Sequence, residues 1–193
     1  MSNLRAASDR YTATAITLHW LIAGLIVGGF AMGLYMTGLK LSPDKLKLYS
    51  WHKWSGMTVL ALAALRIVWR WTHPAPPPLP GQPRWQLQAA QYAHLALYGL
   101  IVAIPLSGWL YSSASGYPVV YFGIKALQLP DLVAKNKELA RSLKEVHEIL
   151  NWTMAALVTV HAAAAVKHHL IDRDGTLARM LPWARRPNTA KST

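Results

Sequence analysis

Four apolar stretches, separated by polar connections, dominate the pattern of this chain. The clearest is residues 15–39, where 25 consecutive side chains carry no charge, and a helix of that length crosses a bilayer. The pattern predicts transmembrane spans at about residues 15–39, 51–71, 86–112 and 145–170. The predicted fold is therefore all-α, an integral membrane four-helix transmembrane bundle.

The second stretch is the least clear membrane span of the four. Its uncharged centre, residues 54–65, has only 12 residues. Lys53, Arg66 and Arg70 must therefore extend their charged ends toward water or pair with an anion. We expect this segment to span the membrane because it lies between two clear spans. The connection after it, residues 73–83, is rich in proline and cannot be helical.

The other residues complete a single domain over residues 1–193. Residues 1–14 form a polar arm, residues 119–144 form an excursion at the membrane surface, and residues 171–193 form a basic tail. A secretory signal peptide is disfavoured because the first apolar run is longer than the core of such a peptide.

Composition supports a membrane protein and excludes several kinds of site. Hydrophobic residues make up 53% of the chain, and its nine Trp and eight Tyr are typical of membrane–water interfaces. The chain has no Cys, which excludes disulfides, Cys-ligated zinc, iron–sulfur clusters and covalently attached haem. The net charge is +12, and the basic residues lie mainly between the apolar runs. This position favours lipid head groups over nucleic acid as their binding partner.

The distribution of charge predicts the orientation. Four spans place both termini on one side, where 11 Lys and Arg residues face three acidic residues. The other side has nine Lys and Arg residues and five acidic residues. The excess of cations on the side of the termini predicts that both termini are cytoplasmic. The outer side still has a basic excess, and eight of its nine cations are Lys.

Histidines lie along one line of the last apolar stretch. His147 and His161 are separated by 14 residues, which is about 21 Å along a helix and close to four full turns, so both rings leave the same face. His168 follows seven residues later on that face. Helix direction places His52 at the same outer depth as His147, which predicts an outer pair.

The inner half holds several histidines, and spacing alone does not pair them. His161 is buried deeply enough to be a ligand, whereas His168 should reach the inner interface. Either His19 or His94 can face His161. Two His–His pairs inside apolar helices suggest two haem b groups, since neutral imidazole is a common axial ligand of haem iron.

Two further interpretations concern the charged residues. Arg66 and Arg70 lie at the inner end of the second span, where they either pair with haem propionates or simply extend to water. Zinc transport is the main competing function for membrane histidines. It is disfavoured because the acidic residues lie only at the ends of the spans.

Several motifs resemble the bacterial cytochrome b561 family, the small diheme membrane cytochromes. The similarity covers about residues 11–182 and implies a single transmembrane cytochrome b domain. The matching segments are TLHWL at 17–21, WHKWSG at 51–56, AHLALY at 93–98, IPLSG at 104–108, LKEVHE at 143–148, VHAAAAVKHH at 160–169 and DGTLARMLP at 174–182.

The resemblance implies a set of site residues. His19 and His161 would hold the inner haem, and His52 and His147 the outer one. His94 and His168 would then be candidates for a quinone site on the inner side. No residue is assigned a catalytic role.

The nearest branch of that family is that of the superoxide:ubiquinone oxidoreductases. This implies a protein of the bacterial inner membrane that passes electrons from periplasmic superoxide through two haems to ubiquinone. The alternatives are an electron-transfer subunit that links a periplasmic dehydrogenase to the quinone pool, and a non-redox metal transporter. Outer lysines would steer the superoxide anion, and these are Lys45, Lys47, Lys53, Lys135, Lys137 and Lys144.

Overall fold

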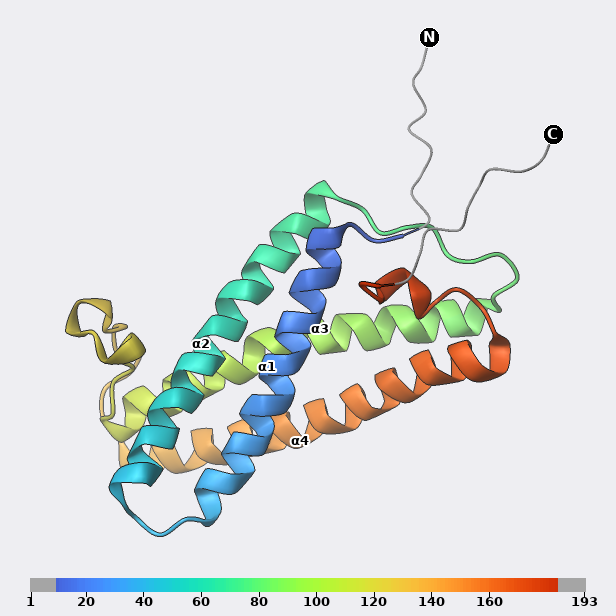
Figure 1. Cartoon of the computed structure of the whole chain (residues 1–193). Helices are drawn as coiled ribbons and strands as arrows, with labels where there is room; N and C mark the ends of the chain where they lie inside the picture. The colour runs from blue at the N-terminus through green and yellow to red at the C-terminus, as the bar shows by residue number, and fades with distance from the viewer. Residues whose placement is uncertain (1–9, 184–193) are drawn as a thin grey trace, which may run out of the picture.

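Four long helices form the chain in the computed structural model, which describes residues 10–183 (Figure 1). They are α1 (Ala13–Gly38), α2 (Pro43–Thr72), α3 (Arg84–Ser115) and α4 (Lys137–Lys167). The described residues contain no β-strand, only an isolated bridge between Val120 and Gln128. The all-α prediction is therefore confirmed.

Polar caps explain where the helices begin. Thr12, Ser42 and Asn136 each accept a hydrogen bond from a backbone N–H in the first turn of α1, α2 and α4, which satisfies a donor that the helix itself leaves free. At its other end α3 stops at Gly116, whose φ of 76° suits glycine. Because Asn136 caps α4, that helix begins eight residues before the predicted span.

The helices pack as two neighbouring pairs. α1 lies beside α2 and α3 lies beside α4, while α2 also contacts α3 (Figure 1). Large apolar side chains such as Val27, Leu95 and Val160 remain exposed on the outside of these helices. An apolar exterior of this kind suits contact with lipid rather than water.

Three of the helices are long and apolar enough to cross a membrane. These are α1, α3 and the helix that runs from Lys137 through Asp172. α2 has 30 residues but does not meet the same criterion, because charged residues flank its short apolar centre. The structure thus shows three candidate spans and leaves the fourth as a prediction.

Short segments close the two ends of the bundle. At the excursion end, defined by residues 117–136, the loop is fastened to α2 through the Trp54 Nε1 to Val120 carbonyl bond of 2.7 Å and the Thr58–Tyr121 hydroxyl contact of 2.6 Å. At the opposite end, here called the termini end, Trp20 Nε1 donates to the Met180 carbonyl at 2.7 Å.

The termini end also brings the two ends of the described chain together. Arg10 donates to the carbonyl of Leu181 at 2.5 Å, and Arg179 donates to that of Pro77 in the proline-rich linker at 2.7 Å. The described chain therefore begins and ends on the side of the linker between α2 and α3. The predictions for residues 1–9 and 184–193, parts of the polar arm and basic tail, lie outside the described residues.

Candidate functional site

Four histidines form two pairs between the helices, and within each pair the two rings face each other. His52 of α2 faces His147 of α4 with ring centroids 6.2 Å apart, and His19 of α1 faces His161 of α4 with centroids 6.3 Å apart. The two separations are almost equal although the partners of the two α4 rings come from different helices. The four residues predicted as haem ligands thus form two facing pairs along α4.

The separation suits a metal held between two imidazoles. A metal with an imidazole nitrogen at about 2 Å on each side places the two ring centroids roughly 6 Å apart. The rings of each pair are steeply inclined to each other, at 88° and 67°, so they are not stacked on one another. Each pair therefore has a separation that would suit a haem iron held between its two imidazoles.

A third ring lies beside the pair at the termini end. The His94 centroid is 5.4 Å from that of His161, closer than His19 is. Arg66 is near enough to interact electrostatically with both His19 and His94. His94 therefore belongs to the same cluster, but its shorter separation differs from that of the two facing pairs.

Hydrogen bonds from α3 orient the His147 ring. Its Nδ1 lies 3.1 Å from the carbonyl oxygen of Ile104 and 2.9 Å from Ser107 Oγ, and that hydroxyl itself donates to the Ile104 carbonyl at 2.8 Å. A carbonyl oxygen only accepts, so Nδ1 must carry the hydrogen. Nε2 is therefore the nitrogen left for a metal, and metal-bound histidines usually donate their other ring N–H to a partner of this kind.

Ser107 was missed by sequence analysis. It is buried, with 6% of its surface exposed, and its position is explained only by the packing of α3 against α4. The IPLSG motif contains it, but the motif alone does not say that its hydroxyl meets a histidine.

Glycines make room for the rings at the excursion end. A Cβ atom on Gly108 would lie 3.1 Å from His147 Cε1, and one on Gly33 would lie 3.5 Å from His52 Cε1. His52 Nδ1 is buried and has no hydrogen-bond partner among the described residues. The Gly29 carbonyl interacts with this ring, although the geometry falls short of a hydrogen bond.

The two arginines predicted to bind propionates have protein partners. Arg66 donates from Nε to the Tyr98 hydroxyl at 3.0 Å and from Nη1 to the Ala15 carbonyl at 2.9 Å. The Arg70 guanidinium lies 5.9 Å from the centre of the Tyr11 ring. These three contacts hold the two side chains at the termini end, and a role toward propionates stays a prediction.

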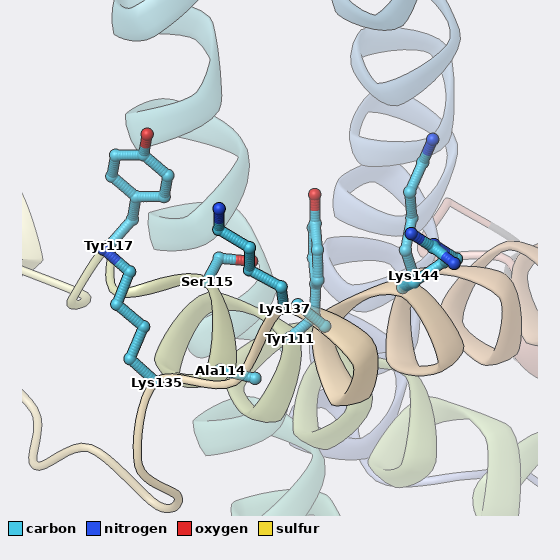
Figure 2. Close-up of a pocket in the computed structure, with 9 residues that line it drawn as sticks. Tyr111, Ala114, Ser115, Tyr117, Lys135, Lys137 and Lys144 are labelled. Atoms are coloured by element: carbon cyan, nitrogen blue, oxygen red, sulfur yellow. The ribbon is translucent and has the colours of Figure 1, made fainter.

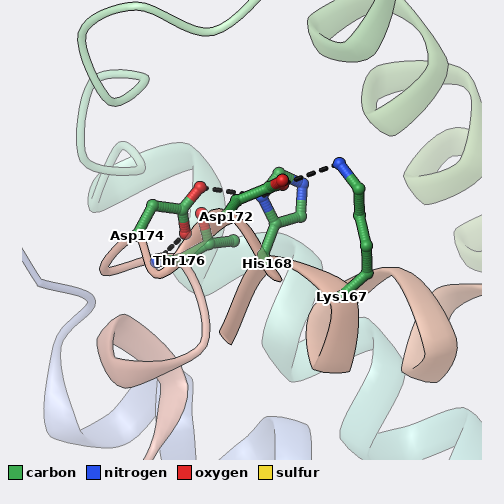
Figure 3. A network of polar contacts seen from close by, with 5 residues as sticks. All are labelled: Lys167, His168, Asp172, Asp174 and Thr176. Carbon is green, nitrogen blue, oxygen red and sulfur yellow. Dashed lines mark hydrogen bonds and ion pairs between the residues drawn. The ribbon is translucent and has the colours of Figure 1, made fainter. Parts of the chain in front are cut away.

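His168 lies in a polar network at the end of α4 (Figure 3). Its Nδ1 is 2.7 Å from Asp174 Oδ2 and 3.0 Å from Asp172 Oδ2. No ring contact joins His168 to His94 in the part of the chain that the structure describes. The two residues predicted for a quinone site are thus at the same end of the bundle but not in contact.

A basic pocket of about 420 Å³ lies at the excursion end, between the end of α3 and the start of α4 (Figure 2). Lys135, Lys137, Arg141 and Lys144 line it together with Tyr111 and Tyr117. Within residues 10–183 none of these four cations forms an ion pair. Arg141 was not among the residues predicted to steer an anion.

The other predicted steering lysines do not line this pocket. Lys45 Nζ donates to the Leu39 carbonyl at 2.6 Å and Lys53 Nζ to that of Tyr117 at 2.9 Å. Lys47 Nζ lies 5.1 Å from the centre of the Trp51 ring. The structure therefore separates the predicted set into three lysines at the pocket and three that make local contacts.

An all-helical chain with membrane-compatible helices and facing imidazole pairs is the architecture expected of a membrane cytochrome. Comparison with known proteins identifies the family. The sequence model described as "Prokaryotic cytochrome b561" matches residues 10–183. The chain therefore belongs to the prokaryotic cytochrome b561 family, as the motifs predicted, and is a multi-pass membrane cytochrome of the kind that binds b-type haem and transfers electrons.

Relatives in Escherichia coli and Yersinia pestis are similar over most of their length. "Cytochrome b561 homolog 2" of Escherichia coli (strain K12) is 37% identical over 174 residues, covering 90% of this chain and 92% of that protein. "Cytochrome b561 homolog 1" of the same organism is 31% identical over 90% of this chain and 98% of its own length. "Probable superoxide oxidase CybB" of Yersinia pestis is 29% identical, covering 91% of this chain and 98% of that protein.

The glycine beside His147 gives a direct test of the site. Gly108→Ala should lower the haem content of the purified protein, because the added methyl group displaces the ring from its position against α3. Haem per chain, measured as the pyridine haemochrome, checks this. Gly99→Ala is the matched control in the same helix, since nothing lies within 4 Å of a Cβ there. Equal haem content in both variants would contradict the role given to Gly108.

Proposed function

We propose that this protein is a diheme cytochrome that oxidises superoxide and reduces ubiquinone across the bacterial inner membrane. The observation that carries the proposal is the presence of two histidine pairs with nearly equal separations. Their members on α4, His147 and His161, are 14 residues apart, which is about 21 Å along the helix. That length brings one pair close to each face of a bilayer.

The four paired histidines are the proposed axial ligands. His52 and His147 would hold the outer haem, and His19 and His161 the inner one. His19 is chosen over His94 because the His19–His161 separation of 6.3 Å matches the His52–His147 separation of 6.2 Å, whereas His94 is 5.4 Å from His161. Each haem, when bound, would supply a carrier of single electrons.

Topology supports placing the excursion end outside. The described chain begins and ends at the same end of the bundle, which requires an even number of crossings. α2 starts where α1 ends and finishes where the linker leads to α3, so it is the proposed fourth span. The excess of cations near the termini supports a cytoplasmic location for that end.

The basic pocket supports an anionic electron donor. Superoxide carries one negative charge, and the four cations around the pocket, which form no ion pair among the described residues, attract small anions from solution. A superoxide ion that gives up one electron becomes molecular oxygen. The relative from Yersinia pestis, whose name describes a superoxide oxidase, points to the same donor.

The termini end is the proposed site of quinone reduction. Ubiquinone takes up two electrons and two protons to become ubiquinol, so two superoxide ions are consumed for each quinone. His94 and His168 are protonatable side chains at this end, and Arg66 and Arg70 are candidates for the propionates of the inner haem. Membership of a cytochrome family argues against the metal transporter, whereas the electron-transfer subunit is retained as the alternative.

Haem stoichiometry tests the two-site proposal. We expect about two b-type haems per chain, since two histidine pairs are available. His52→Ala should lower the count to about one, because the pair at the termini end is built from other residues. His169→Ala, at an exposed histidine of the same chain, should leave the count unchanged. Loss of both haems, or of neither, in His52→Ala would contradict the pairing.

Quinone reduction by superoxide tests the activity. Purified protein in detergent is mixed with a continuous source of superoxide, catalase and a short-chain ubiquinone, and quinol formation is followed by absorbance. We expect formation well above the uncatalysed rate, and its abolition by added superoxide dismutase. Formation at only the uncatalysed rate, in a protein that binds its haems, would favour the electron-transfer subunit.

Salt dependence tests the steering by the basic pocket. The rate at low superoxide concentration should fall roughly tenfold as ionic strength rises, because screening shortens the reach of the pocket charges to about 8 Å at about 0.15 M salt. Lys137→Gln with Lys144→Gln should lower both the rate and this salt dependence. Lys125→Gln, outside the pocket, is the matched control. A rate independent of salt would leave the pocket without a part in the reaction.

A further inference from the structure

The end of α4 folds into an uncommon turn that places two carboxylates on one histidine nitrogen. The helix ends in the π-helical turn η3 (His168–Asp172), and the chain then reverses at Arg173, whose φ is 51°. A non-glycine residue rarely adopts this conformation. The reversal is closed by the Asp174 N–H, which donates to the His168 carbonyl at 3.1 Å.

Asp174 is the principal partner of His168 (Figure 3). Its Oδ2 is 2.7 Å from His168 Nδ1, and its Oδ1 accepts from the Thr176 N–H at 2.8 Å. Asp172 also approaches Nδ1, at 3.0 Å, but the same oxygen is 2.7 Å from Lys167 Nζ. Asp172 is thus shared with a lysine, whereas the charge of Asp174 is directed at the imidazole.

Asp174 stays ionised in this network. Burial opposes the charge, but the hydrogen bonds from Thr176 and His168 and the nearby imidazole outweigh it, so the pKa of the Asp174 carboxyl lies below its usual value. The titratable groups in contact with His168 among residues 10–183 are Asp172 and Asp174, with Lys167 reached through Asp172.

The arrangement fixes which nitrogen of His168 is available. Carboxylates only accept hydrogen bonds, so Nδ1 carries a hydrogen, and Nε2 makes no hydrogen bond within the described part of the chain. The ring is partly accessible, with 17% of the side chain exposed. A proton taken up at Nε2 gives the ring a positive charge, which the adjacent carboxylates offset.

We propose that Asp174 positions His168 as the residue that donates a proton to ubiquinone at the termini end, an inference that rests on the proposed function. The Nε2–H bond breaks and an O–H bond forms on a quinone oxygen, while two superoxide ions supply the two electrons through the haems and the aqueous side supplies the second proton. His168 then recovers its proton from the adjacent aqueous side. Asp174 itself touches no substrate and acts through the imidazole.

A metal site is the alternative for the same residues, since their ligand atoms lie within 4.8 Å of one another. The contacts argue against it. His168 Nδ1 is hydrogen-bonded to a carboxylate oxygen of Asp174. The Lys167 ammonium already forms an ion pair with the Asp172 oxygen that faces the cluster. A divalent cation would have to displace both hydrogen bonds and lie next to a positive charge.

The test follows haem reduction by a short-chain ubiquinol in the oxidised full-length protein, with no superoxide present. Asp174→Asn keeps the acceptor for the Thr176 N–H but removes the charge, and His168→Gln removes the proton carrier. Both should slow haem reduction about 100-fold and change its pH profile, and Asp174→Glu should restore most of the rate. His169→Gln, on the same turn, is the matched control and should behave as wild type.

A second measurement separates this proposal from the proposed function. Reduction of the haems by superoxide without quinone should be unchanged in Asp174→Asn and His168→Gln, because the donor enters at the other end. Wild-type ubiquinol kinetics and pH profile in Asp174→Asn would overturn the positioning role, as would an equal loss in His169→Gln. Stoichiometric zinc binding that is lost in Asp174→Asn, with wild-type ubiquinol kinetics, would assign the cluster to a metal instead.

Discussion

The hydrogen bond from His147 Nδ1 to the Ile104 carbonyl is the interaction on which the excursion end depends. A membrane interior offers no water to satisfy a ring nitrogen, so the partner must come from another helix. The bond fixes the ring orientation and draws α4 against α3 at Gly108, where a side chain would collide with the imidazole. Helix packing and the orientation of the His147 ring are therefore set by the same contact.

The central position of α4 follows from the spacing of its histidines. Rings that leave one face at intervals of 14 and seven residues can meet partners only on helices packed along that face. The sequence therefore predicted the depth of each ring and the pairing of His52 with His147. It did not pair His161, because distance along a helix axis does not say which neighbouring helix a ring faces. That choice depends on packing, which places His19 and His94 at different separations from His161.

The residues that sequence analysis missed all act between elements distant in the chain or in unusual turns. Ser107 reaches a histidine 40 positions away, and Asp174 reaches His168 only because a π-helical turn and Arg173 reverse the chain. The apolar runs predicted the helices themselves well, because burial in lipid is decided by side-chain character over some 20 residues. The early start of α4 escaped prediction because the Asn136 cap lies within a charged segment.

The two ends of the bundle hold their charges in opposite ways. At the excursion end, the helix dipole disfavours the charge of Lys137 in the first turn of α4. Arg141 and Lys144 follow at spacings of four and three residues, where like charges repel. At the termini end, Lys167 is instead paired with a carboxylate. A cationic pocket without ion pairs among the described residues gains free energy from any anion that enters, whereas the paired network holds the His168 ring in one orientation. This difference suits a protein that receives electrons from an anion at one end and delivers them together with protons at the other.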